Sequence, residues 1–411
     1  MRLLHRDGTT VHLGYCTNVH PAEDLAGIVG QLDRYAVPVR ERLGADRLGL
    51  GLWLAHDVAR ELAADRAAST ALRAELDARG LEVVTLNGFP YRGFHDPVVK
   101  GAVYHPDWTT RDRLGYTLDL ADVLGVLLPD DVPHGSISTL PLAWREPWDG
   151  PRRAAAGERI RALEAGLAAR AARDGRPVRV GFEPEPGCAV ETVAQVEREL
   201  AGLGPDLLGL CLDVCHLAVT FEDPARVLAR LAAAGLAVVK VQASCALQAD
   251  DPADPAVREA LAGFVEPRFL HQTREPAAPP GPGTVPAAGT GSASAAGTAA
   301  VLAADDLGDA LAGPHALPGA APWRVHFHVP LHAPPQPPLT GTSAVLEDTL
   351  ALLLGGPAAL ADHIEVETYT WSVLPPAQRP AGDAALAAGI AAEVAWAAGK
   401  LTGLGLKEAG A

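Results

Sequence analysis

Short apolar runs alternate with longer segments of helical periodicity along most of the chain. The short runs are rich in Val, Leu and Gly and predict β-strands at residues 11–18, 47–54, 81–88, 135–142, 178–185, 207–214, 237–244 and 363–370. The longer segments predict helices such as 22–44, 56–79, 110–128, 154–173, 223–235 and about 383–402. Strands that alternate with helices are typical of βα units around a parallel sheet, and eight units favour a closed (β/α)8 TIM barrel of the α/β class over an open sheet.

The predicted strands have one apolar face and one face of small or polar residues. In the strand at 207–214, leucines occupy one face, whereas the other face begins with Gly209 and ends with Asp213. The last strand places Glu365 and Glu367 together on its polar face. The apolar faces suit surrounding helices, so we expect the second faces to line the barrel interior. Their carboxylates would then lie at the C-terminal mouth, where TIM-barrel enzymes carry their active sites.

Two stretches interrupt this alternation. Residues 88–109 are long and aromatic-rich, follow the third predicted strand, and predict a lid over the mouth. Residues 275–320 are rich in Pro, Ala, Gly and Ser and predict a largely disordered low-complexity insertion before the last strand, with disorder centred on about 275–300. Such a segment buries too little apolar surface to offset its ordering entropy. We expect one TIM-barrel domain over residues 1–411 that contains this insertion.

Charge and composition exclude several classes of protein. The net charge of −16, without a basic stripe, argues against nucleic acid as a partner. The five cysteines are odd in number and scattered, which suits a reducing compartment. The N-terminal segment lacks a secretion signal, and no uninterrupted apolar stretch reaches about 20 residues, so we expect no membrane insertion. These features predict a cytoplasmic protein.

Carboxylate and imidazole side chains gather at the predicted mouth. Three of the last four strands end in inward-facing carboxylates, which would repel one another strongly unless a cation neutralised them. Mixed carboxylate and imidazole ligands suit a divalent metal: Mn²⁺, Mg²⁺, Co²⁺ or Zn²⁺. The predicted metal ligands are Glu183, Asp213, His216, His326, His328 and Glu367. Salt bridges at the mouth, and solvated histidines in "HFHV", are the alternative interpretations.

Other polar side chains predict proton transfer and substrate contacts. The candidate acids and bases are Glu185, Glu365 and Lys240. The candidate substrate contacts are Asn18, His20, Asn87, Gln242 and His271. Helix capping by the two asparagines, and a short helix and turn at 263–273, are the alternatives. Cys211 and Cys215 flank Asp213, but the absence of a CxxC pair disfavours a thiolate site.

The order of these residues resembles a known superfamily. Glu on strand five, Asp-x-x-His on strand six, a His-rich stretch before strand eight and Glu on strand eight look like the xylose isomerase-like TIM barrels, which include sugar isomerases, epimerases and AP endonucleases of the endonuclease IV type. More narrowly, "VHLGYCTNVHP", "TLNGFPY", "GSISTLPL", "EPEPGC" and "LCLDVCH" resemble the EboE family of metabolite traffic proteins of the ebo gene clusters. The narrow resemblance covers nearly the whole chain except residues 275–320.

The resemblance implies metal contacts from four residues and a role in metabolite chemistry or transport. The implied contacts are Glu183, Asp213, His216 and Glu367. Endonuclease-type members carry His where this chain has Gln242 and Asn87, and Asp-x-His where it has His326-x-His328, so one or two metals fit better than three.

The leading hypothesis is a metal-dependent isomerase or epimerase of a small polyhydroxylated, sugar- or cyclitol-like metabolite. A metal-dependent phosphoester hydrolase is the second hypothesis. A non-catalytic metabolite-binding or traffic protein is the third. Separately, the resemblance implies association with other ebo-cluster proteins.

Overall fold

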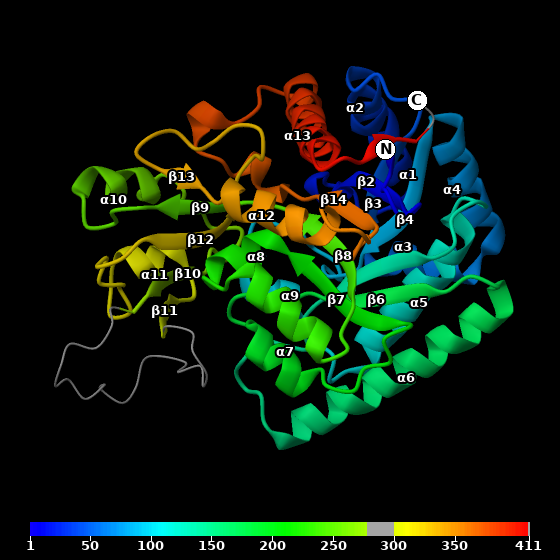
Figure 1. Cartoon of the computed structure of the whole chain (residues 1–411), viewed down its shortest axis with the longest axis horizontal. Coiled ribbons are helices and arrows are strands. Elements are labelled where there is room, and N and C mark those ends of the chain that lie inside the picture. The colour runs from blue at the N-terminus through cyan, green and yellow to red at the C-terminus, as the bar shows by residue number, and fades with distance from the viewer. Residues whose placement is uncertain (278–299, 410–411) are drawn as a thin grey trace.

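A closed barrel of parallel strands forms the centre of the molecule (Figure 1). The computed structural model describes residues 1–277 and 300–409. The eight barrel strands are β2 (Thr10–Cys16), β3 (Leu48–Trp53), β4 (Leu81–Asn87), β5 (Gly135–Thr139), β6 (Val178–Phe182), β7 (Leu208–Asp213), β8 (Val238–Ala243) and β14 (His363–Val366). β14 pairs in parallel with both β8 and β2, which closes the barrel. The predicted TIM barrel is therefore confirmed, and each strand begins within one residue of its predicted start.

Helices cover the outside of this barrel (Figure 1). They are α1 (Leu25–Gln31), α2 (Val37–Arg42), α3 (His56–Ala64), α4 (Arg66–Ala78), α5 (Arg111–Leu127), α6 (Gly150–Asp174), α7 (Val193–Glu199), α8 (Val214–Val219), α9 (Pro224–Ala233), α12 (Ser343–Leu354) and α13 (Asp383–Gly403). The helix predicted at 56–79 is two helices, because the Asp65 side chain accepts hydrogen bonds from the amides of Ala67 and Ala68 and starts a new helix. The helix predicted at 22–44 contains a π-helical turn at Leu32–Ala36.

Helix α13 is long and apolar enough in composition to cross a membrane. In the described structure it instead packs along α2 and β2, with Ala387, Ile390 and Val394 buried. Its apolar character therefore serves the core of the barrel domain.

A second sheet, which the sequence did not predict, is inserted between β8 and β14. Its five strands are β9 (Ala246–Ala249), β10 (Thr273–Pro276), β11 (Val301–Ala304), β12 (Trp323–His328) and β13 (Thr340–Gly341), in the antiparallel order β11-β10-β12-β9-β13. Two helices flank it, α10 (Pro255–Ala262) and α11 (Leu307–Leu311). Figure 1 shows this sheet beside the barrel. It makes β12 an internal strand, so "HFHV" is neither an edge nor solvated.

The predicted low-complexity insertion overlaps this sheet. Residues 278–299 lie outside the described part of the chain. Residues 300–320, in contrast, include strand β11 and helix α11. The predicted disordered stretch therefore extends too far toward the C-terminus. Glu275 supplies a physical reason, because its buried carboxylate accepts hydrogen bonds from Trp323 Nε1 and from backbone amides of 319–321. These hydrogen bonds thus hold residues 319–323 in place beside β10, although the neighbouring segment has few apolar residues.

The predicted division of strand faces is confirmed in the barrel interior. A Cβ atom added at Gly51 would lie 1.1 Å from Glu365 Oε1, so the glycine makes room for a buried carboxylate. Glu365 forms an ion pair with Lys240, and both side chains are fully buried. All five cysteines are free and buried. At the N-terminal end of the barrel, short strand β1 (Arg2–Leu4) pairs antiparallel with the start of β2 and with β15 (Lys407–Glu408).

Candidate metal centre

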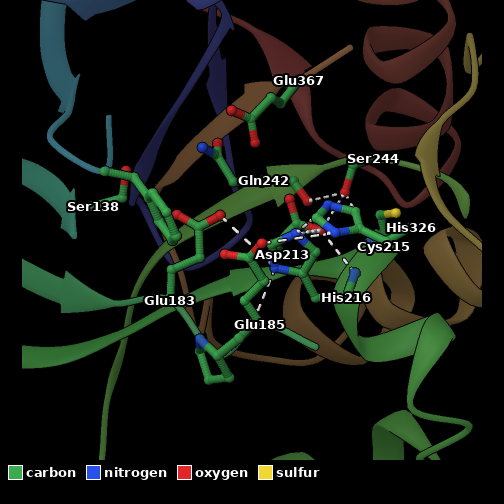
Figure 2. A network of polar contacts seen from close by, with 12 residues as sticks. Ser138, Glu183, Glu185, Asp213, Cys215, His216, Gln242, Ser244, His326 and Glu367 are labelled. Carbon is green, nitrogen blue, oxygen red and sulfur yellow. Dashed lines mark hydrogen bonds and ion pairs between the residues drawn. The ribbon is translucent and has the colours of Figure 1, made fainter. Parts of the chain in front are cut away.

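A pocket opens at the C-terminal mouth of the barrel, with about 510 Å³ of empty space that is partly continuous with solvent. Its floor carries carboxylates and imidazoles, and its wall carries aromatic rings. Figure 2 shows the side chains of Glu183, Asp213, His216 and His326 directed toward one another. The barrel strands supply the carboxylates, whereas β12 of the inserted sheet supplies two imidazoles. The site therefore depends on both parts of the fold.

Three carboxylates meet on the floor. Glu183 follows β6, Asp213 ends β7 and Glu367 follows β14, and each offers an oxygen within 4.8 Å of the others. Burial and the neighbouring charges raise the pKa of Glu183 and of Glu367 well above the usual value. Glu183 Oε2 and Asp213 Oδ2 are buried and have no hydrogen-bond partner among the described residues. Buried, unpartnered carboxylate oxygens that face one another are the donor set a divalent cation requires.

Two of the three carboxylates, Asp213 and Glu367, are also held in place by hydrogen bonds to one oxygen. Asp213 Oδ1 accepts from Ser244 Oγ at 2.8 Å and from the His216 amide at 2.9 Å. The Asp213 side chain thereby caps α8 and turns His216 toward the pocket. Glu367 Oε1 accepts from Asn18 Nδ2 at 2.8 Å and from Asn87 Nδ2 at 3.0 Å.

Three imidazoles complete the donor set, and their hydrogen bonds assign their tautomers. In each ring, Nδ1 faces a carbonyl oxygen, which can only accept a hydrogen bond. The contacts are His216 to the Pro184 carbonyl at 2.9 Å, His326 to Gln272 Oε1 at 2.6 Å and His328 to the Glu367 carbonyl at 2.8 Å. Nδ1 therefore carries the proton, and Nε2 presents its lone pair. This is the arrangement in which histidine binds a metal.

Burial keeps these imidazoles neutral. It lowers the pKa of His216 to about 4, lowers that of His326 well below the usual value and lowers that of His328. His216 Nε2 and His326 Nε2 lie 3.0 Å apart. With both protons on Nδ1, two lone pairs face each other at this distance, which is favourable only beside a positive centre.

The donor atoms form overlapping groups: Asp213 belongs to two of them, and so does His216. The groups without a thiol are Glu183–Asp213–Glu367, Asp213–His216–His328 and Glu185–His216–His326, each with ligand atoms within 4.8 Å of one another; Cys215 forms a further group with His326 and His328. All six predicted metal ligands are thus brought together. The overlap provides room for one or two cations, and the donor chemistry fits a divalent metal.

Glu185 belongs to a hydrogen-bonded chain that the sequence did not predict. Tyr104 Oη donates to Glu185 Oε1 at 2.7 Å, Gln272 Nε2 donates to Tyr104 Oη at 2.8 Å, and Gln272 Oε1 accepts from His326. Burial raises the pKa of Glu185 to about 8. The chain fixes the orientation of His326 and Glu185 together. Tyr104 lies in the aromatic-rich segment 88–109, and its place in that segment was the only signal in the sequence.

The remaining predicted site residues divide into those that line the pocket and those that do not. Asn18 and Asn87 line it. His20 lies outside its lining, because its ring stacks on Tyr35 at a centroid distance of 4.1 Å. His271 is held behind the site, where its ring nitrogens contact the His326 carbonyl and Glu266, each at 2.9 Å.

Lys240, Glu365 and Gln242 also lie outside the pocket lining. They are fully buried in the barrel interior, and Lys240 and Glu365 form an ion pair with each other. The amide of Gln242 has no hydrogen-bond partner within the described part of the chain. Their strand positions therefore point inward as expected, but their side chains do not reach the pocket surface.

The segment 88–109 covers the pocket, as its composition led us to expect of a lid. It includes a 3-10 turn, Lys100–Tyr104, and its backbone amides at Val99 and Lys100 both donate to the Arg268 carbonyl at 2.8 Å. Phe94 packs against Phe269 with ring centroids 5.2 Å apart. The cover is thus docked on the inserted sheet region.

Comparison with known proteins places this site in a wider context. The model of the family "Xylose isomerase-like TIM barrel" matches residues 40–264. No curated protein matches the chain significantly. A magnesium complex of a xylose isomerase-like TIM-barrel protein from Mycobacterium smegmatis is 12% identical with a TM-score of 0.48, over 95% of this chain and 98% of that one. A D-allulose 3-epimerase from Methylomonas sp. is 18% identical with a TM-score of 0.38, over 59% and 74%. The 3-keto-D-glucoside 4-epimerase of E. coli is 16% identical with a TM-score of 0.37, over 56% and 79%.

Proposed function

The chain belongs to the xylose isomerase-like TIM-barrel family, and from that premise we propose that it is a metal-dependent isomerase or epimerase of a small polyhydroxylated metabolite. One observation carries the proposal: three neutral imidazoles, each with Nδ1 hydrogen-bonded to a carbonyl oxygen, meet three buried carboxylates on the floor of a pocket. Glu183, Asp213, His216, His326, His328 and Glu367 would hold the metal. A bound divalent cation would polarise a carbonyl or hydroxyl oxygen of the substrate.

Glu185 is the residue best placed to move a proton. It lines the pocket, and its Oε1 is occupied by the Tyr104 hydroxyl, which leaves Oε2 for exchange with a ligand. Its raised pKa, about 8, suits proton transfer near neutral pH. Asn18 and Asn87 orient Glu367 and present amides at the pocket surface. Lys240 and Glu365 lie beneath the site, where they neutralise each other, so we assign them a structural role and not proton transfer.

The pocket wall supports a sugar- or cyclitol-like ligand. Phe89, Phe94, Phe269 and Tyr369 line it and offer apolar ring faces to the C–H faces of a carbon ring. The floor offers polar groups to its hydroxyls. Among the described lining residues, Lys100 is the only lysine or arginine, and it is already ion-paired with Asp306. A phosphate group would therefore find no unpaired side-chain cation and would depend on the metal alone, which disfavours the phosphoester hydrolase.

The first experiment measures metal content by mass spectrometry on protein purified without a metal-affinity tag. We expect stoichiometric metal in the wild type, loss in Asp213→Ala and Glu183→Ala, and no loss in Glu158→Ala, whose side chain is 63% exposed. The second incubates the loaded protein with a panel of sugars and cyclitols in deuterated water. Isomerisation or epimerisation through proton removal introduces deuterium at carbon, and we expect Glu185→Gln to abolish it while metal is retained.

The deuterium experiment also separates the alternatives. Binding without exchange would instead support the non-catalytic metabolite-binding role that the EboE resemblance implies. A folded wild type that stays empty after incubation with Mn²⁺ and Zn²⁺ would refute the metal-dependent enzyme. Cytoplasmic location and association with other ebo-cluster proteins stay predictions from the sequence.

A further inference from the structure

A second group of metal-binding side chains lies at the opposite end of the barrel. His134 directly precedes β5, and Asp362 and His363 stand at the start of β14. Each offers a ligand atom within 4.8 Å of the other two. His363 is 1% exposed, whereas the side chains of His134 and Asp362 are 19% and 21% exposed. The group is therefore anchored in the interior and reachable from solvent.

The hydrogen bonds of His363 leave one ring nitrogen unused. Ser136 Oγ donates its proton to Thr85 Oγ1 at 2.8 Å, so it can only accept from His363 Nδ1, also at 2.8 Å. Nδ1 therefore carries the proton. Nε2 then presents a lone pair, is buried, and has no hydrogen-bond partner in residues 1–277 and 300–409. Burial also lowers the pKa of His363 to about 3, which keeps the ring neutral.

The contacts among the three side chains do not satisfy this nitrogen. His134 Nε2 lies 3.0 Å from Asp362 Oδ2, yet it makes no properly directed hydrogen bond to any described residue. The rings of His134 and His363 stack with centroids 5.0 Å apart and an interplanar angle of 19°. A simple ion pair between His134 and Asp362 would leave His363 Nε2 buried and unpaired, which is unfavourable.

We propose that His134, Asp362 and His363 form a second divalent-cation site, for Zn²⁺, at the N-terminal end of the barrel. Two imidazoles and one carboxylate are borderline ligands of the kind Zn²⁺ prefers, and the exposed side of the group leaves space for water as a fourth ligand. The hydrogen bond from His363 to Ser136 is the outer contact that orients a metal-binding imidazole. This proposal is independent of the function assigned to the mouth.

The position of the site gives it a structural role. Going round the barrel, β5 and β14 are separated by β8, β7 and β6 on one side and by β4, β3 and β2 on the other. They are therefore opposite walls, and no backbone hydrogen bond joins them. A cation held by both would cross-link the barrel across its end. We expect Zn²⁺ to raise the thermal unfolding midpoint through this link.

The test uses the full chain, purified without a metal-affinity tag and stripped with a chelator. The variants are His134→Ala and Asp362→Asn, both at partly exposed positions, with exposed His315→Ala as the matched control. We expect each test variant to bind one equivalent of Zn²⁺ less than the wild type and to lose part of the Zn²⁺-dependent rise in unfolding temperature. His315→Ala should behave as the wild type.

A second background separates this site from the mouth. In Glu183→Gln/Asp213→Asn, we expect about one equivalent of Co²⁺ or Zn²⁺ to remain, with the visible absorption bands of Co²⁺ bound to nitrogen and oxygen ligands. Adding His134→Ala to this background should abolish both the remaining metal binding and the Co²⁺ absorption bands. Unchanged Zn²⁺ content and unchanged unfolding temperatures in His134→Ala and Asp362→Asn would overturn the proposal, as would a mouth variant that folds but binds no metal.

Discussion

Replacing Glu393 by Gln should change how the stability of the protein depends on pH. Glu393 lies on α13 and is 1% exposed. Its Oε1 accepts from Thr368 Oγ1 at 2.6 Å and from the Leu331 amide at 3.0 Å, and its Oε2 accepts from Trp371 Nε1 at 3.2 Å. Burial outweighs these hydrogen bonds and raises the pKa of Glu393 to about 7. The buried carboxyl therefore holds its proton more tightly in the folded protein than in the unfolded chain.

The sign and size of the effect follow from this difference. A glutamate in the unfolded chain titrates near 4.5, so the folded and unfolded pKa values differ by about 2.5. That difference corresponds to about 3 kcal/mol of folding free energy. Because the folded state binds the proton more tightly, this contribution is fully present below pH 4.5 and is lost as the pH rises through 7. Gln resembles the protonated carboxyl in shape and charge and does not titrate.

Urea unfolding of the wild type and Glu393→Gln between pH 4 and 8 tests the reasoning. At pH 4 the two proteins should differ by no more than about 1 kcal/mol, the value of one hydrogen bond. Between pH 4 and pH 8, the wild type should lose about 3 kcal/mol of unfolding free energy relative to the variant. Glu158→Gln, exposed on α6, is the control and should follow the wild type. Parallel pH profiles for the wild type and Glu393→Gln would refute the buried-proton explanation.

Three further predictions concern the mouth and the barrel interior. Glu183→Gln should abolish metal binding at the mouth but stabilise the metal-free protein, because the neutral amide can be buried without the proton uptake that the raised pKa of Glu183 implies. Metal analysis and thermal unfolding in chelator check both effects. Tyr104→Phe should weaken Zn²⁺ binding at the mouth by about 10- to 100-fold, because it breaks the hydrogen-bonded chain that orients His326. Chelator competition measures the affinity, and an unchanged value would contradict the role of these hydrogen bonds. Gly51→Ala should destabilise by about 3 kcal/mol or more, because its Cβ would displace Glu365 from its ion pair. Gly399→Ala, whose added Cβ meets no atom within 4 Å, is the control for chemical denaturation.

The candidate site divides into a predictable and an unpredictable part. Asp213 and Glu367 were predictable because they end or follow strands whose alternation fixes which residues face the interior. His326 and His328 were named as ligands from their place in the sequence, but the separate antiparallel sheet that carries them on β12 was not predicted. Pairing in such a sheet joins residues far apart in sequence, so it cannot be predicted from local periodicity.

The sequence by itself determined the barrel, the inward faces of its strands and the types of ligand at its mouth, because strand and helix periodicities are local and a parallel βα repeat has few solutions. Only the tertiary structure decided which of these polar side chains share a pocket. His20 and His271 are held away from it by Tyr35 and Glu266. Lys240 and Glu365 neutralise each other inside the barrel. Such partnerships depend on distances between segments remote in sequence, and those distances are set by packing rather than by local pattern.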